Sequence, residues 1–157
     1  MAKEKSYRPN VAAIVLSSKY PFTNEIMVAN RIDIRSDAWQ FPQGGIDDGE
    51  TPQEALFREL REEIGTDEVD IIAEHPEWIS YDFLNKGAKK IYPFDGQTQK
   101  YFLVKLKHGA EINLDTHEPE FMAYKFIAYK EVIETISNIK KPIYKRVLTH
   151  FKKEGYL

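Results

Sequence analysis

The sequence predicts an α/β fold in which a sheet lies between helices. Short β-branched runs occur on both sides of one central segment with strong helix signals, and an amphipathic segment ends the chain. The 157 residues, 42% of them hydrophobic, suffice for the core of one domain spanning residues 1–157.

Apolar runs bounded by turn residues mark the expected strands. Val11-Ala-Ala-Ile-Val-Leu16 is the first, and the run 25–29 is expected to pair with it as a hairpin. A short strand over 39–41 stops before Pro42, and 43–49, which contains two consecutive glycines, is expected to be a loop. The remaining expected elements are strands at 69–73, 78–81, 99–106 and 121–127, and a loop at 86–96.

The segment 52–64 is predicted to be the central helix. Thr51 can act as N-cap, Pro52 suits the first helical position, and Glu54 completes a capping box. Gly65 supplies the C-terminal stop. Two later helices are expected, over 130–139 and from Pro142 onward, where Ile143, Val147 and Phe151 recur every four residues.

Three glutamates of the central helix, Glu59, Glu62 and Glu63, fall in one wedge beside its apolar face, together with the small Ala55. Arg58 can pair with Glu62 at i,i+4 but cannot neutralise three carboxylates. A hard divalent cation such as Mg²⁺ or Mn²⁺ can do so through oxygen ligands. A solvated acidic face is the alternative.

The two glycines before this helix favour a ligand site over a solvated face. Gly44 and Gly45 allow the backbone to approach a ligand closely, next to the acidic wedge. The chain has no cysteine, which excludes thiolate ligands and thiolate nucleophiles. The four histidines show no metal-ligand spacing. Any metal is therefore expected to be bound mainly by carboxylate and carbonyl oxygen.

The charge pattern bears on partners and location. A formal net charge of −3 gives no global attraction to nucleic acid, so an anionic partner needs a local basic patch. The segment 140–157 offers one, although a solvated basic helix would look the same. No apolar run is long enough to span a bilayer and no signal peptide is evident, so a cytoplasmic protein without a membrane partner is expected. No sequence feature indicates an obligate protein partner.

The basic residues of the segment 140–157 are Lys140, Lys141, Lys145, Arg146, Lys152 and Lys153.

Gly44, Glu50 and the run Arg58-Glu-Leu-Arg-Glu-Glu-Ile-Gly65 resemble the signature of the Nudix hydrolases. The resemblance implies a Nudix-type α/β/α sandwich with a mixed β-sheet and a helical C-terminal tail. It also implies hydrolysis of a nucleoside diphosphate linked to another group. Thr66 departs from the signature, where a bulky aliphatic residue is usual.

The signature also implies residue roles. Glu59, Glu62 and Glu63 resemble the metal-binding glutamates of the family, with the carbonyl of Gly44 as a further ligand. Arg58 resembles the residue that orients these glutamates, and Glu50 resembles a partner of the helix and loop.

Further segments resemble one branch of the family, which contains bacterial RNA pyrophosphohydrolases and dinucleoside polyphosphate hydrolases. The branch implies metal-dependent conversion of a 5′-triphosphorylated or 5′-diphosphorylated RNA end to a 5′-monophosphate, which promotes mRNA decay. A diadenosine tetraphosphate hydrolase is the alternative, and a binding module without catalysis is a third reading. The matching segments are 7–11, 39–46, 96–100, 110–113, 119–121 and 144–147.

The same branch implies further site residues. Glu120 resembles a fourth active-site carboxylate and metal ligand, from outside the central helix. Ile139 stands where the branch often has an aromatic residue that stacks on a base. The expected substrate-binding residues are Arg8, Arg31, Tyr81, Gln97 and Lys140.

Overall fold

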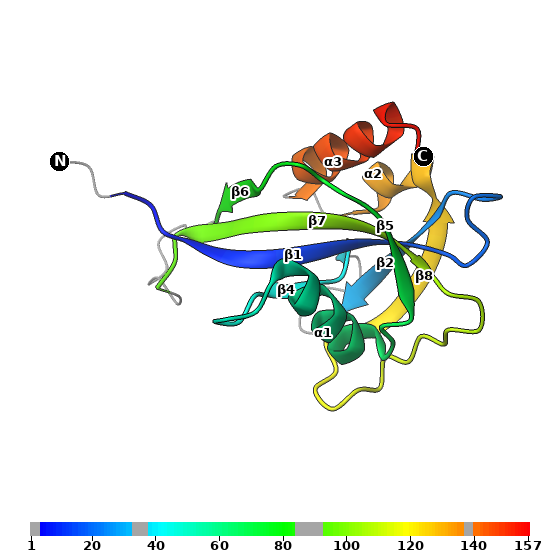
Figure 1. Cartoon of the computed structure of the whole chain (residues 1–157), viewed down its shortest axis with the longest axis horizontal. Coiled ribbons are helices and arrows are strands. Elements are labelled where there is room, and N and C mark those ends of the chain that lie inside the picture. The colour runs from blue at the N-terminus through cyan, green and yellow to red at the C-terminus, as the bar shows by residue number, and fades with distance from the viewer. Residues whose placement is uncertain (1–3, 33–37, 84–92, 137–139) are drawn as a thin grey trace.

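A computed structural model of the chain describes residues 4–32, 38–83, 93–136 and 140–157 (Figure 1). Within these ranges eight strands form one sheet, in the order β3-β2-β1-β7-β5, with β4 on β1, β6 on β7 and β8 on β2. The sheet is mixed, because the long β1–β7 pair is parallel and the other pairs are antiparallel. The strands are β1 (Tyr7–Leu16), β2 (Glu25–Arg31), β3 (Trp39–Gln40), β4 (Gln43–Gly45), β5 (Val69–Glu74), β6 (Ile79–Asp82), β7 (Gly96–Leu106) and β8 (Phe121–Ala128).

Helices cover both faces of the sheet, which confirms the predicted α/β/α sandwich (Figure 1). The helix α1 (Pro52–Ile64) lies on one face, and α2 (Val132–Thr135) and α3 (Lys141–Lys153) lie on the other. A short 3₁₀ helix, Tyr129–Glu131, precedes α2. In the described part of the chain, no helix has the length and apolar character needed to cross a bilayer.

The central strand β1 explains the two layers of core. Its residues 11–16 are all buried, because successive side chains point to opposite faces and both faces are covered. Val11, Ala13 and Val15 pack with Leu56, Leu60 and Ile64 of α1. Ala12, Ile14 and Leu16 pack with the α3 residues Tyr144, Val147, Leu148 and Phe151.

The predicted helix boundaries of α1 are confirmed. The amide of Glu54 donates to Oγ1 of Thr51 at 3.1 Å, and the amide of Thr51 donates to Oε1 of Glu54 at 3.0 Å. Gly65 ends the helix in the left-handed region, with φ 74°. Without a Cβ, glycine adopts this conformation at little cost.

Three sequence predictions need correction. The expected loop 43–49 begins with β4, whose residues 43–45 pair with residues 10–12 of β1. This edge of β1 is open to β4 because β2 pairs with β1 only at Leu16 and Ile26. The expected helix 130–139 is wrong in extent, since α2 ends at Thr135 and residues 137–139 lie outside the described residues.

The third correction concerns the expected loop 86–96. Its last residue, Gly96, begins β7, where it pairs with Tyr7 of β1 and Asp82 of β6. A Cβ at Gly96 would overlap the backbone carbonyl of Tyr81. Residues 84–92 lie outside the described residues.

Candidate active site

The strand β4 sends consecutive residues to opposite faces of the sheet. Gly44 faces α1, where a Cβ would overlap the carboxylate of Glu59. Gln43 faces the α3 side, where its Oε1 accepts a hydrogen bond from Nε2 of Gln99 at 2.6 Å. The three residues of β4 therefore link the acidic helix on one face to a polar cluster on the other.

Arg58 contacts Glu50, which precedes α1, and two glutamates of α1 itself. Its Nε and Nη2 donate to the two carboxylate oxygens of Glu50 at 2.7 and 2.8 Å, and Nη2 also donates to the carbonyl of Gly45 at 2.8 Å. Its Nη1 donates to Glu59 at 2.8 Å and to Glu62 at 3.1 Å. The predicted Arg58–Glu62 pair is present, within a larger network.

The same network explains the ionisation of Glu50. The hydrogen bond from Arg58 and then that from the Asp47 amide lower the pKa of Glu50 to about 2. Glu50 is therefore ionised throughout the neutral range, and it ties the loop before α1 to the middle of the helix.

Glu63 is the least satisfied of the acidic residues that the structure describes. It is 2% exposed, and among the described residues neither of its carboxylate oxygens has a hydrogen-bond partner. Burial, followed by the nearby carboxylates of Glu59 and Glu120, raises the pKa of Glu63 well above its ordinary value. A buried carboxylate without a partner needs a proton or a cation to offset its desolvation.

Glu59 shares this environment. Burial raises its pKa, and the interactions with the side chains of Glu63 and then Arg58 oppose the change. The face of α1 that carries the glutamates is thus partly buried in the core. Ala55, which the helical wheel places on the same face, is also fully buried. Proximity of Glu59 and Glu63 concentrates negative charge at the sheet end of the cluster.

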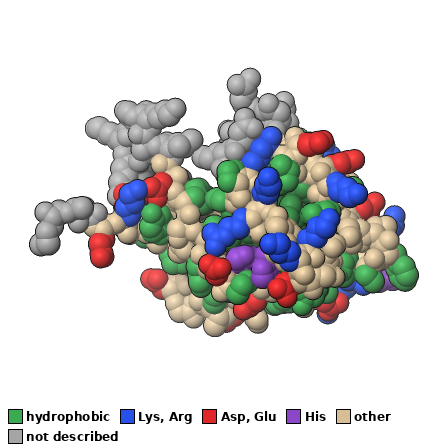
Figure 2. All heavy atoms as spheres, turned by 90° about the horizontal axis from the view of Figure 1, so that it is seen from above, with side chains coloured by type: hydrophobic (Ala, Val, Ile, Leu, Met, Phe, Trp, Pro, Cys, Tyr) green, Lys and Arg blue, Asp and Glu red, His purple; other side chains and the backbone are tan. Residues whose placement is uncertain are grey.

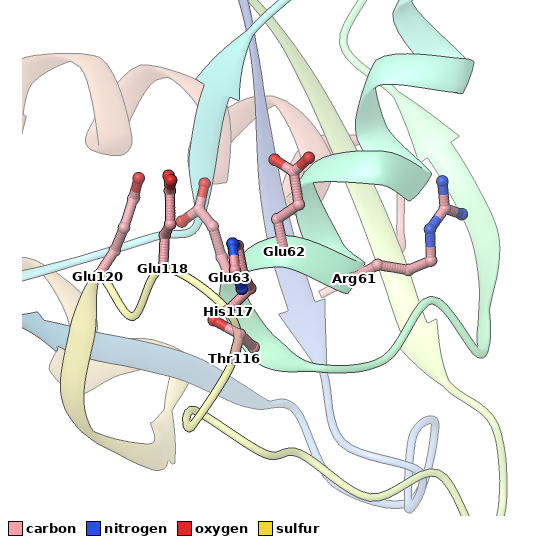
Figure 3. Close-up of a pocket in the computed structure, with 7 residues that line it drawn as sticks. All are labelled: Arg61, Glu62, Glu63, Thr116, His117, Glu118 and Glu120. Carbon is pink, nitrogen blue, oxygen red and sulfur yellow. The ribbon is translucent and has the colours of Figure 1, made fainter.

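A cavity of about 440 Å³ lies beside these glutamates (Figure 3). Glu62 and Glu63 enter it from α1, and Glu118 and Glu120 enter it from the segment that leads into β8. The structure therefore brings the predicted Glu120 to the helix. Glu118 was missed, although its spacing of two residues from Glu120 is a signal. The other lining residues are Arg61, Thr116 and His117.

As arranged here, the described acidic and histidine side chains include no group of three that could by itself hold a metal ion. In this arrangement one nitrogen of the Arg58 guanidinium contacts both Glu59 and Glu62.

Lys140 and Tyr81 meet on the α3 side of the sheet. Nζ of Lys140 donates to Oε1 of Gln43 at 2.8 Å and lies 5.7 Å from the centre of the Tyr81 ring. The hydroxyl of Tyr81 donates to Oε1 of Gln97 at 2.7 Å. Burial, and then the positive charge of Arg31, lower the pKa of Lys140 to about 8. Three of the predicted substrate-binding residues are therefore in one cluster.

The two predicted arginines flank this cluster. Arg8 pairs with Gln97 in the parallel β1–β7 register, and Gln97 pairs with Tyr81 of β6, so the three lie in one row across neighbouring strands. Arg31 ends β2 beside Phe121, the residue after Glu120, and its charge acts on Lys140. Ile139 lies outside the described residues.

Buried amide side chains connect the polar cluster, and the sequence predictions did not include them. Nε2 of Gln99 donates to Asn10 at 2.9 Å as well as to Gln43, and the hydroxyl of Tyr101 donates to Oε1 of Gln99 at 2.8 Å. Asn10 and Gln99 are almost fully buried. The sequence contained a signal for them, since Asn10 and Gln99 each stand at the start of an apolar run that was expected to form a strand.

Thr66, the departure from the signature, is also accounted for. The residue is buried, and its Oγ1 accepts a hydrogen bond from the amide of Glu68 at 3.1 Å. The hydroxyl therefore stabilises the turn after α1 in place of aliphatic packing.

The NUDIX domain profile matches residues 6–147 of the chain. A curated protein named RNA pyrophosphohydrolase from a Nitratiruptor species is 65% identical over 154 residues, which cover 98% of this chain and 99% of that protein. One of the same name from Campylobacter jejuni subsp. jejuni serotype O:2 is 62% identical over 157 residues, covering 100% of both chains.

Solved structures share the fold at low identity. The binary complex of a C. elegans Ap4A hydrolase matches 93% of this chain and 98% of its own with a TM-score of 0.68 at 18% identity. The E. coli dihydroneopterin triphosphate pyrophosphohydrolase matches 93% and 99% with a TM-score of 0.66 at 18% identity. Since the profile match and the full-length relatives agree with the sandwich and its acidic helix, the chain belongs to the NUDIX domain family of hydrolases.

Proposed function

We propose that this protein is an RNA pyrophosphohydrolase, which hydrolyses a phosphoric anhydride bond at a 5′-triphosphate or 5′-diphosphate end of RNA and leaves a 5′-monophosphate. The observation that carries the proposal is full-length similarity, at 57–65% identity, to relatives named for this activity. The geometry supports it independently, because an acidic cluster and a lysine–tyrosine cluster meet at β4.

The acidic cluster fits a hard divalent cation, Mg²⁺ or Mn²⁺. The fit rests on the two buried oxygens of Glu63, which have no hydrogen-bond partner among the described residues, and on the close approach of the Glu59 carboxylate to Gly44, where a Cβ would displace it. The donor set consists of oxygen alone, as these cations prefer. We assign as ligands Glu59, Glu62, Glu63, Glu120 and the carbonyl of Gly44. When bound, the cation supplies positive charge that neutralises the polyphosphate and activates a water molecule.

Within this proposal, Arg58 has a positioning role. Its contacts fix Glu59 and Glu62 on one side and Glu50 and Gly45 on the other. The helix and the glycine loop therefore keep their relative position while charge develops at the phosphates, as electrostatic stabilisation of a transition state requires. Glu120 adds a carboxylate from a separate segment, across the cavity from α1.

The lysine–tyrosine cluster is proposed to bind RNA beyond the reacting phosphates. The cation of Lys140 can bind a phosphate, and the ring of Tyr81 can stack on a base. Arg8, Arg31 and Gln97 add two cations and an amide nearby. These contacts distinguish an RNA end from a free nucleotide.

Substrate length tests the proposal. The kcat/KM on a 5′-triphosphorylated oligonucleotide with an unpaired 5′ end is compared with that on ATP and on diadenosine tetraphosphate, at one Mg²⁺ concentration. Two contacts beyond the first nucleoside, each of about 1 to 2 kcal/mol, predict a preference of roughly thirtyfold to a thousandfold for the oligonucleotide over ATP.

Comparable values on ATP and the oligonucleotide would refute an RNA-specific enzyme. A higher value on diadenosine tetraphosphate than on RNA would favour the dinucleoside polyphosphate hydrolase. The same oligonucleotide with a base-paired 5′ end serves as control, since a base in a duplex cannot be splayed onto a side chain.

A further inference from the structure

A second cavity lies on the outer side of α3, on the face of the sheet opposite to α1. It has a volume of about 550 Å³ and is formed between α3 and the segment from His75 to Glu77, which connects β5 to β6. Figure 2 shows Lys and Arg side chains gathered around the histidines on this surface. None of the residues assigned above to catalysis or substrate binding lines it. We call it the α3 groove, and the lining residues used below are His75, Glu77, Lys145, Arg146, His150 and Lys153.

The rim of the α3 groove is basic. Lys145, Arg146 and Lys153 are all exposed and all line the groove, and Lys153 follows Arg146 by seven residues, about two turns of α3. Glu77 is the one acidic residue among those that line the groove, and it pairs with Arg146 at 3.1 Å. An ion pair this exposed contributes little free energy, so the guanidinium can exchange the carboxylate for a phosphate.

The floor of the groove is aromatic. The rings of His75 and His150 lie with their centres 4.6 Å apart. Burial, and then the proximity of His150, keep the pKa of His75 below its ordinary value, so this ring is neutral near pH 7. Because His75 is 3% exposed and the two rings are inclined at 59°, the rings form the floor beneath the cations, and the exposed cations at the rim are the groups that can bind the phosphates of single-stranded RNA.

The position of the groove relates it to the active site. The helix α3 begins directly after Lys140 and ends at Lys153, a rise of roughly 20 Å at 1.5 Å per residue, and Lys145 and Arg146 of the groove lie between these two residues. A strand whose 5′ end is bound at Lys140 and Tyr81 can therefore continue along the helix. The overall negative charge of the protein makes such a local path necessary for RNA.

We propose that the α3 groove binds the backbone of single-stranded RNA downstream of the nucleotides held at Lys140. The inference rests on the proposed function and extends it, because it assigns a second, sequence-independent contact to the same substrate. Phosphate contacts of this kind raise affinity without reading bases.

The test compares two double variants of equal charge. Lys145→Gln with Lys153→Gln alters the groove, whereas Lys130→Gln with Lys152→Gln removes two lysines that do not line it. All four side chains belong to exposed residues, so both proteins are expected to fold, which their thermal unfolding midpoints check. The kcat/KM is measured on 5′-triphosphorylated oligonucleotides of three and of twelve nucleotides.

The groove variant should lose about five- to twentyfold in kcat/KM on the twelve-nucleotide substrate at low salt, with a much smaller loss on the three-nucleotide one. Binding of a twelve-nucleotide RNA with a 5′-hydroxyl, measured by fluorescence anisotropy, should weaken in parallel. The dependence of log K on log salt should become shallower by about 1.4, since each phosphate contact on a single strand contributes about 0.7. The control variant should resemble the wild type in each measurement.

Equal losses of kcat/KM in the groove and control variants would refute RNA binding by the α3 groove. Equal losses of the groove variant on the three- and twelve-nucleotide substrates would refute it as well. If a poly-glutamate peptide displaces the 5′-hydroxyl RNA as effectively as a competitor RNA of equal charge does, RNA binding by the groove is refuted in favour of an acidic protein partner. Failure of the proposed function is a separate result, because it appears in the wild type as equal activity on ATP and on triphosphorylated RNA.

Discussion

The guanidinium of Arg58 and the carboxylate of Glu50 form a two-point contact, with donor–acceptor distances of 2.7 and 2.8 Å. This planar match is geometrically specific in a way that a lysine could not reproduce. Since Arg58 also contacts Glu59, Glu62 and the carbonyl of Gly45, the pair connects the loop before α1 to the carboxylates of the site. Loss of Glu50 should therefore affect both stability and activity.

Glu50→Gln should lower the stability of the protein in a pH-dependent way. The pKa of Glu50 falls from 4.5 to about 2 on folding, so its stabilising contribution is complete above about pH 4.5 and is lost as the pH falls towards 2. The difference between wild type and variant in urea unfolding should shrink between pH 6 and pH 3. Glu111→Gln, at an exposed loop position, is the control. A difference that stays constant over this range would contradict the contact.

Glu62→Gln and Glu63→Gln should each lower kcat at least about a hundredfold, because each removes charge that holds the proposed cation. Glu63→Gln should at the same time raise the thermal unfolding midpoint without divalent cation, since it removes a buried carboxylate whose oxygens have no hydrogen-bond partner in the described part of the chain. Glu68→Gln, exposed beyond the end of α1, should leave kcat unchanged. Near-normal activity of either site variant at low Mg²⁺ would refute the assigned ligands.

Lys140→Ala should weaken activity on triphosphorylated RNA more than on diadenosine tetraphosphate. The reason is that a lysine beside Gln43 and Tyr81 is proposed to meet phosphates downstream of the 5′ end. The salt dependence of RNA binding should also become shallower, because fewer counterions are released. Steady-state kinetics on both substrates measure the effect, and equal losses would remove Lys140 from the RNA-specific contacts.

Tyr144→Phe should destabilise the protein by about 1 to 3 kcal/mol, the usual result of leaving a buried amide without an acceptor. The hydroxyl oxygen of Tyr144 accepts a hydrogen bond from the amide of Phe41 at 3.0 Å, and the two rings stack with centres 4.1 Å apart. Urea unfolding measures the loss. Tyr20→Phe, which removes a less buried hydrogen bond to the carbonyl of Tyr156, should cost less.

The sequence alone determined the central helix and restricted the ligands available to the proposed cation. The cap at Thr51, the stop at Gly65 and the wedge of Glu59, Glu62 and Glu63 are all local, because residues within four positions on a helix have a fixed geometry. The absence of cysteine excluded sulfur ligands, and the four histidines without metal-ligand spacing left oxygen as the expected ligand type. The signature around these residues then gave the family.

Only the tertiary structure decided how deeply each carboxylate is buried and what lies beside it. The helical wheel treats Glu62 and Glu63 alike, yet the side chain of Glu62 is 58% exposed whereas Glu63 is buried, because the sheet and the segment of Glu120 cover one of them. The strand β4 was missed for a similar reason. Three residues with two glycines have no strand signal of their own, and they become a strand because the edge of β1 is available for their backbone hydrogen bonds.

The polar cluster around Lys140 depends still more on long-range contacts. Lys140 and Gln43 are 97 positions apart, and Phe41 and Tyr144 are 103 apart. Their meeting follows from the pairing register of the strands and from the packing of α3 on the sheet, and no local pattern carries that information. The residue types at the site were therefore readable from the chain, whereas their distances, burial and pKa values were set by the folded arrangement of distant segments.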